Sequence, residues 1–250
     1  MTTPITWIIP MAGKGTRTQS LGEFKPFVEI NESKMITWFL FSIRNNIKRN
    51  DVIVFVTTPY FSKKFEVEDT LCSVLKNLKI TNKFHLAETQ DISHGQSESI
   101  LSAENIVDKS TTVVVANPDQ YIDFCLPEVL TDCYLALYLS LSEKSGFVRI
   151  ENGEIIHFVE KKNISNLASA GIYIVPKAGI LFDAIREQIR EGEMVNGEFY
   201  LGPVFNIIMK KGNRVKPLEV RAKYDLGNVR DISYFRKRFA DNIRILNELQ

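Results

Sequence analysis

The first half of the chain alternates between short β-branched runs and segments in which apolar residues recur at helical spacing. Such runs are typical of parallel strands that are buried on both faces. Candidate strands are residues 7–10, 52–56, 83–87 and 112–117. The apolar stripes with a helical period are formed by Ile36, Phe39, Leu40, Ile43 and Ile47, and by Leu71, Val74, Leu75 and Leu78. This alternation predicts an α/β fold with a doubly wound sheet.

The pattern changes after about residue 125. The runs LALYLSL, SGFVRI, EIIHFVEK and SAGIYIV are strand-like and are joined by short polar turns, which predicts antiparallel pairing. Helical spacing returns at 177–190 and 199–211. A last helix is predicted from the stripe Ile232, Phe235, Phe239, Ile243 and Leu246. Because no linker or repeat is present, we expect one domain over residues 1–250, a Rossmann-like mixed sheet with an antiparallel second portion.

Composition narrows the class of protein. The chain of 250 residues is 44% hydrophobic, which suffices for a large core and excludes a disordered chain. Its net charge of +1 weighs against a nucleic-acid partner. No apolar run approaches the ~20 residues that span a bilayer, and no signal peptide is evident, so we expect a cytoplasmic protein without a membrane partner. The cysteines Cys72, Cys125 and Cys133 form no CxxC pair, and we expect all three to be buried thiols.

A glycine-rich loop follows the first strand, in the stretch IIPMAGKGTRTQSLGEFKPFVEI at residues 8–30. Small residues at Ala12, Gly13 and Gly15 let backbone N–H groups converge on a phosphate. Cations that can add to this nest are Lys14, Arg17 and Lys25. The dinucleotide pattern GxGxxG fails because Thr18 stands at its third small position, and GxxxxGK[ST] is absent. The loop therefore predicts a polyphosphate site of another kind.

The motif GKGTR with KPFVEI resembles the signature GxGTRxxxxxxxKPxxxI of the sugar-phosphate nucleotidylyltransferases. The resemblance continues through HGQSESI, NPDQYID, FVEKKN, SAGIYIV, NGEFYLG and YDLG, and so covers nearly the whole chain. Within the family, the chain is most similar to a subgroup associated with capsule and surface-polysaccharide clusters, which includes a phosphoglutamine cytidylyltransferase. The implied fold is the nucleotidyltransferase fold, similar to that of GT-A glycosyltransferases. The implied reaction transfers NMP from an NTP to a phosphorylated acceptor, a sugar 1-phosphate or a related phosphate, and releases pyrophosphate.

The resemblance also implies roles for residues of the first half, about 1–125, which would bind the nucleotide. Arg17, Lys25 and Asp119 would be catalytic, with both cations stabilising the leaving pyrophosphate. Asp119 and Asp225 would hold Mg²⁺, an ion that binds one or two carboxylates together with substrate phosphates. Residues of the nucleotide site would be Ala12, Gly13, Lys14, Gly15, Glu88 and Gly95. The base stays open between pyrimidine and guanine, with CTP favoured by the cytidylyltransferase likeness.

The second half, about 126–250, would bind the acceptor and end in a helix. By the resemblance, the acceptor residues are Glu160, Lys161, Gly171 and Glu198. Two positions depart from the family pattern: Lys162 replaces a proline after the EK pair, and Ser169 replaces an asparagine. Both departures lie in the half that would recognise the acceptor.

Two other functions remain open. A non-catalytic nucleotide sensor or scaffold would keep the glycine loop but lose the metal carboxylates, whereas Asp119 and Asp225 are both present. A glycosyltransferase would share the topology, but residues 117–119 read Asn-Pro-Asp instead of the aspartate motif DxD. A homo-oligomer is compatible with all these readings.

Overall fold

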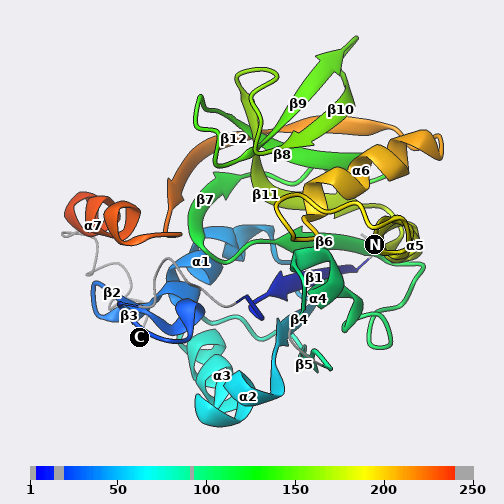
Figure 1. The fold of residues 1–250 in the computed structure, drawn as a ribbon. Coiled ribbons are helices and arrows are strands. Elements are labelled where there is room, and N and C mark those ends of the chain that lie inside the picture. The colour runs from blue at the N-terminus through cyan, green and yellow to red at the C-terminus, as the bar shows by residue number, and fades with distance from the viewer. Residues whose placement is uncertain (1–3, 14–19, 91–92, 240–250) are drawn as a thin grey trace.

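The structure is a computed structural model that describes residues 4–13, 20–90 and 93–239. Its first four long strands are β1 (Ile5–Pro10), β4 (Val52–Thr57), β5 (Phe84–Glu88) and β6 (Thr112–Ala116). They are parallel and lie side by side in the order β5-β4-β1-β6 (Figure 1). This is the strand order of a Rossmann half, so the predicted α/β sheet is confirmed. The carboxyl ends of these strands therefore meet at one edge of the sheet.

The second half of the chain extends the same sheet and makes it mixed. β6 pairs antiparallel with β11 (Leu167–Val175), and β11 pairs antiparallel with β8 (Cys133–Leu139). β8 then pairs in parallel with β12 (Val215–Asp225), whose far end pairs antiparallel with β7 (Gln120–Phe124). A ribbon of β9 (Gly146–Glu151) and β10 (Glu154–Glu160) projects from the sheet next to β11 (Figure 1). The expected antiparallel second portion is thus present.

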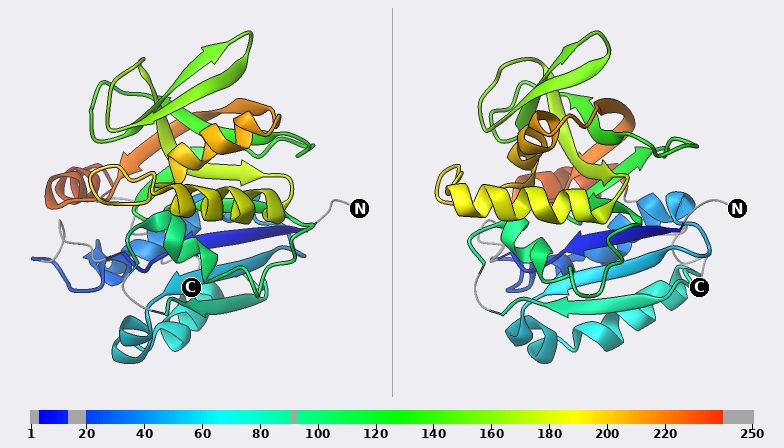
Figure 2. Two further views of the ribbon diagram at one scale, coloured as in Figure 1. Left: turned by 45° about the vertical axis from the view of Figure 1, so that its right-hand side comes forward. Right: turned by 90° about the vertical axis from the view of Figure 1, so that its right-hand side faces the viewer.

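Helices cover both faces of the sheet (Figure 2). One face packs on α1 (Met35–Ile43), α3 (Val67–Asn77) and α7 (Val229–Arg238), and the other packs on α4 (Gln96–Leu101), α5 (Ala178–Glu191) and α6 (Leu201–Lys210). The sheet divides the apolar core into two clusters, one on each face. Because side chains alternate along a strand, Trp7 and Ile9 belong to the cluster under α1, α3 and α7, and Ile8 belongs to the cluster under α4, α5 and α6. Smaller elements are α2 (Pro59–Lys64), the strands β2 (Glu29–Ile30) and β3 (Ser33–Lys34), and the 3₁₀ turns Lys25–Phe27 and Arg44–Asn46.

Several expectations need correction. Ile47 does not continue the apolar stripe of α1, because that helix ends at Ile43. The Asn46 side chain, which lies between them, donates to the Phe124 carbonyl at the end of β7 and accepts from the Leu126 amide. Cys72 and Cys125 are exposed, and Cys133 alone of the three is buried. Ile232 and Phe235, which belong to α7, are buried as predicted, whereas Ile243 and Leu246 lie outside the described residues.

Candidate functional site at the carboxyl edge of the sheet

Lys25 and Asp119 form an ion pair at the carboxyl edge. Lys25 opens the 3₁₀ turn before β2, and Asp119 lies between the end of β6 and the start of β7. The Lys25 Nζ donates to Asp119 Oδ2 at 2.6 Å, and the two side chains are 15% and 35% exposed. An ammonium and a carboxylate that were 94 positions apart in sequence thus meet where an open α/β sheet places its ligand.

Asp225 reaches the same edge on β12. It ends that strand and stands opposite Gln120, the first residue of β7. The next amide, that of Leu226, donates to the Asp119 carbonyl oxygen at 2.8 Å. At Gly227 an added Cβ would lie 3.3 Å from Asp119 Oδ2 and 3.8 Å from Lys25 Nζ. The chain after Asp225 therefore runs directly against the Lys25–Asp119 pair, and a glycine there keeps the approach open.

Asp225 also has a lysine partner, Lys223, which the sequence analysis did not single out. The Lys223 ammonium donates to Asp225 Oδ1 and lies 4.6 Å from the centroid of the Tyr138 ring. The Lys223 side chain is 9% exposed, whereas that of Asp225 is 52% exposed. Each of the two predicted metal carboxylates thus already binds an ammonium group.

These residues fit a divalent cation of the Mg²⁺ type. Oxygen ligands suit that ion, which keeps several waters and uses substrate phosphates to complete its coordination. The two aspartates offer carboxylate oxygens in a place where the fold already holds positive charge. Among the described residues no group of three or more histidine, cysteine or acidic side chains gathers to form a closed metal cage. Two carboxylates beside a substrate phosphate would suit that ion without such a cage.

The nucleotide loop is described only in part. Ala12 is buried and Gly13 exposed, and the Met11 amide donates to the Val56 carbonyl at 2.7 Å, which holds the chain beyond β1 against β4. Lys14, Gly15 and Arg17 lie outside the described residues. Glu88 is exposed at the carboxyl end of β5, on the same edge.

Gly95 has a structural reason to be glycine. Its φ is +147°, and an added Cβ would lie 2.5 Å from the Phe199 amide nitrogen. Two backbone hydrogen bonds hold the start of α4 against Phe199: the Phe199 N–H donates to the His94 carbonyl at 2.8 Å, and the Ser97 N–H donates to the Phe199 carbonyl at 3.0 Å. The close approach therefore joins the predicted nucleotide and acceptor halves.

The predicted acceptor pair lies at the end of β10. Lys161 adopts φ of +54°, its amide donates to the Ser145 carbonyl at 3.0 Å, and its ammonium donates to the Tyr200 hydroxyl. Glu198 lies near this pair, because its charge acts on Glu160. Glu198 precedes α6, which begins at Leu201, and it closes the Asn196–Gly197 turn by pairing with Val195.

Packing around Phe158 fixes the end of β10. An added Cβ would lie 2.2 Å from the Phe158 ring at Gly146 and 2.0 Å from it at Gly202, so both positions must lack a side chain. The Asn206 amide then brackets the Phe158 backbone, accepting from its N–H at 2.9 Å and donating to its carbonyl at 2.8 Å. These contacts hold β10 against α6, and Lys161 directly after β10 contacts Tyr200.

Burial shifts the pKa of Glu160, a member of the predicted acceptor pair, and that of Tyr173. Loss of solvation raises the pKa of Glu160 to about 7, the Lys161 charge lowers it in part, and the Glu198 carboxylate raises it further. Burial also raises the pKa of Tyr173, with the charges of Glu160 and Asp119 acting in the same direction. The charges of a predicted acceptor residue and of a predicted metal ligand thus both act on Tyr173.

Gly171 is held against the strand that leads to Asp119. Its φ is +73°, and its carbonyl accepts from the backbone N–H of Asn117 at 2.9 Å. An added Cβ would lie 2.8 Å from the side-chain nitrogen Nδ2 of Asn117. The Gln96 side chain donates to Asn117 Oδ1 from the first turn of α4. Sequence reasoning missed this role of Asn117, although its place in the NPDQYID motif was a signal.

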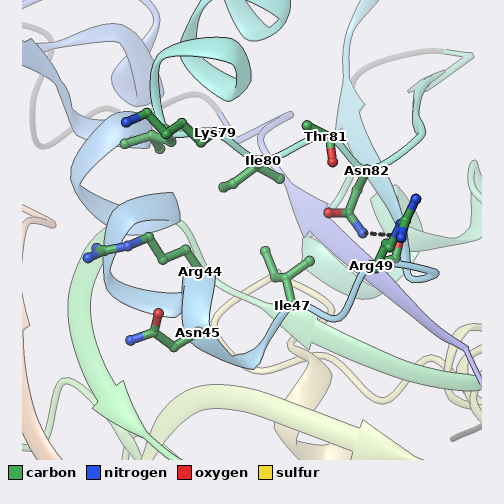
Figure 3. A pocket seen from close by; sticks show the side chains of 9 residues that line it. Arg44, Asn45, Ile47, Arg49, Lys79, Ile80, Thr81 and Asn82 are labelled. Atoms are coloured by element: carbon green, nitrogen blue, oxygen red, sulfur yellow. Dashed lines mark hydrogen bonds between the residues drawn. The ribbon is translucent and has the colours of Figure 1, made fainter. Parts of the chain in front are cut away.

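A hollow at the opposite edge of the sheet is separate from this site. Its lining comes from the segments that precede β4 and β5 (Figure 3). The Asn82 side-chain amide there donates to the carbonyls of Lys48, Arg49 and Asp51, and Figure 3 marks the bond to Arg49. In Figure 3 the side chains of Arg44 and Lys79 and those of Ile47 and Ile80 line it. The carboxyl ends of the strands, where the candidate site lies, are on the far side.

Comparison with known proteins identifies the class. The family model described as nucleotidyl transferase matches residues 7–241, and the chain belongs to that family. A nucleoside-diphosphate-sugar pyrophosphorylase from Vibrio cholerae RC9 superposes with a TM-score of 0.81 at 21% identity, covering 92% of this chain and 99% of that one. A UDP-glucose pyrophosphorylase in complex with UDP-glucose gives 0.74 at 19% identity, with 96% and 99% covered.

A third solved structure, the inositol-1-phosphate CTP transferase from T. maritima, has a TM-score of 0.72 at 15% identity and covers 96% of each chain. At these identities the likeness establishes the fold. No match was found among curated proteins. Over the described residues, none of the helices combines the length and the apolar character that crossing a bilayer requires.

Proposed function

We propose that this chain transfers a nucleotidyl group from a nucleoside triphosphate to a phosphorylated small-molecule acceptor and releases pyrophosphate. Family membership supports nucleotidyl transfer. The observation that carries the assignment is the meeting of Lys25, Asp119 and Asp225 at one edge of the sheet. Residues 1–125 would bind the nucleotide and residues 126–250 the acceptor, within a cytoplasmic protein that needs neither nucleic acid nor a membrane.

The chemical difficulty is charge, because an acceptor phosphate must attack the α-phosphorus of a triphosphate. Positioning and charge neutralisation are therefore the main catalytic needs, and no protein nucleophile is required. Lys25 and Arg17 would stabilise the departing pyrophosphate, and Ala12, Gly13, Lys14 and Gly15 would surround the triphosphate. A Mg²⁺ ion held by Asp119 and Asp225 would neutralise phosphate charge when bound.

Acceptor recognition would fall to the end of β10 and its neighbours. The Lys161 ammonium, held by the Tyr200 hydroxyl, is suited to a phosphate, and Glu160 to hydroxyl groups. Gly171 and Glu198 would border the same space, while Glu88 and Gly95 would contact the base. The structural likeness to an inositol-1-phosphate CTP transferase supports CTP as the first triphosphate to test. A sugar phosphate or phosphoglutamine, for capsule or surface polysaccharide synthesis, is the proposed acceptor class.

Pyrophosphate release tests this function. Purified protein is mixed with Mg²⁺, each of the four triphosphates in turn, and a panel of sugar 1-phosphates and phosphoglutamine. We expect release that requires both substrates and is lost in Asp119→Asn and Asp225→Asn. Triphosphate binding without acceptor-dependent release would favour a nucleotide sensor, and sugar transfer from a nucleotide sugar would favour a glycosyltransferase.

A further inference from the structure

Lys223 is a nearly buried ammonium beside the proposed metal site. Its side chain is 9% exposed, although placing a charge away from water is unfavourable unless a partner compensates for it. The compensation comes from Asp225, two positions on along β12, and from the face of the Tyr138 ring at 4.6 Å. Tyr224 between them packs on Tyr121 and Phe239 instead. Lys223 and Asp225 therefore share the side of β12 opposite to Tyr224.

The contacts of Lys223 lead into the acceptor half. The Tyr138 hydroxyl lies 3.0 Å from Ser145 Oγ, and the Ser145 carbonyl accepts from the Lys161 amide at 3.0 Å. Tyr138 also stands opposite Ala168 in β11, three residues before Gly171. Lys223 thus lies between the carboxylate proposed to bind metal and the residues proposed to bind the acceptor.

Resting on the proposed function, we infer that Lys223 acts together with Lys161 in binding the phosphate of the acceptor once a divalent cation has bound Asp225. Without metal, the ammonium neutralises Asp225. When a metal ion draws that carboxylate away, the ammonium loses the one carboxylate that pairs with it among the described residues, while it still lies over the face of the Tyr138 ring. Lys25 pairs with Asp119, the other proposed metal ligand, in the same way. Two lysines thereby link metal occupancy to anion binding, Lys25 toward the triphosphate and Lys223 toward the acceptor.

The test uses Mn²⁺ as the metal and inorganic anions as probes. Lys223→Met and Lys223→Arg are compared with wild type and with Lys216→Met, which removes a lysine of the same strand that pairs with Asp132. Calorimetry first measures Mn²⁺ alone. It then measures orthophosphate in the presence of saturating Mn²⁺ and inorganic triphosphate, so that the triphosphate site is filled. Circular dichroism verifies that each variant is folded.

We expect Lys223→Met to bind Mn²⁺ several-fold more tightly and orthophosphate about tenfold more weakly, as the loss of one charged hydrogen bond implies. Lys223→Arg should retain most of the phosphate affinity, and Lys216→Met should match wild type. Unchanged orthophosphate affinity in Lys223→Met overturns the inference, because Lys223 would then be a structural partner of Asp225 only. Weakened triphosphate binding with normal orthophosphate binding overturns it too. If Asp225→Asn binds Mn²⁺ as wild type does, Asp225 is not a metal ligand and the inference fails. The proposed function fails separately, if wild type releases no pyrophosphate with any pair of triphosphate and acceptor.

Discussion

The ammonium of Lys25 lies 2.6 Å from the carboxylate of Asp119 across the carboxyl edge of the sheet. The pair joins the turn after the glycine loop to the segment after β6, and the backbone of Leu226 and Gly227 packs against it. A cation and a proposed metal ligand are thus in direct contact before any substrate arrives.

Replacing Lys25 tests the catalytic share of that contact. We expect Lys25→Met to lower kcat/KM for pyrophosphate release by about 10²- to 10³-fold, the range seen when one preorganised charge-stabilising donor is removed. Lys64→Met is the matched control, because Lys64 pairs with Glu23 on the surface, where both side chains are nearly half exposed. Steady-state kinetics of both variants decide the matter, and a Lys25→Met value within threefold of wild type would remove Lys25 from the mechanism.

Glu160 should make stability depend on pH. The fold raises the pKa of this carboxyl from 4.5 to about 7, so the folded state holds a proton that the unfolded state has released. The stabilisation is complete below pH 4.5 and is lost as pH rises through about 7. We expect the free energy of unfolding of Glu160→Gln to exceed that of wild type by up to about 3 kcal/mol at pH 8 and by almost nothing at pH 4.5.

Urea unfolding at the two pH values measures this difference. Glu151→Gln on the same ribbon is the control, because Glu151 is 61% exposed and its pairing with Arg149 is a surface contact. Equal effects of Glu160→Gln at both pH values would show that the carboxyl is solvated.

Gly171 and Gly153 separate backbone strain from steric conflict. Both have positive φ, +73° and +80°, but an added Cβ at Gly153 meets nothing within 4 Å, whereas at Gly171 it meets Asn117 at 2.8 Å. Gly153→Ala should destabilise by about 1 to 2 kcal/mol through strain alone. Gly171→Ala should add about 1 to 3 kcal/mol for overpacking. Chemical denaturation of both variants checks the ordering, and equal losses would contradict the contact with Asn117.

The three cysteines should differ in reactivity. Burial raises the pKa of Cys133 to about 12, whereas Cys72 and Cys125 are exposed. A thiol reagent at pH 8 should modify two groups per chain quickly and the third only after unfolding. The double variant Cys72→Ser/Cys125→Ser should show no fast phase. A fast phase in that variant would place Cys133 at the surface.

Periodicity predicted the first half of the fold because its strands are buried on both faces, which leaves continuous apolar runs such as that of β6. The same reasoning missed β12, where charged side chains alternate along one face and Pro217 interrupts the run. Asp225 was therefore found only as part of a motif. Its ion-pair partner Lys223, two positions before it, carried no pattern of its own.

The proposed site was predicted from motifs rather than from geometry. Lys25, Asp119 and Asp225 are far apart in sequence, and only the topology shows that they meet. Contacts across elements had no local signal: Gln96 on Asn117, Phe158 between two glycines, and Lys161 on Tyr200. These contacts depend on tertiary packing, which spacing along a single chain does not encode.

Anomalous diffraction from a crystal soaked with Mn²⁺ and a nonhydrolysable triphosphate would locate the metal ion relative to Lys25, Asp119 and Asp225. We expect one strong peak with the carboxylates of Asp119 and Asp225 as its protein ligands and phosphate oxygens on its other side. A peak bound by other residues, with triphosphate remote from Lys25 and Asp119, would contradict this arrangement.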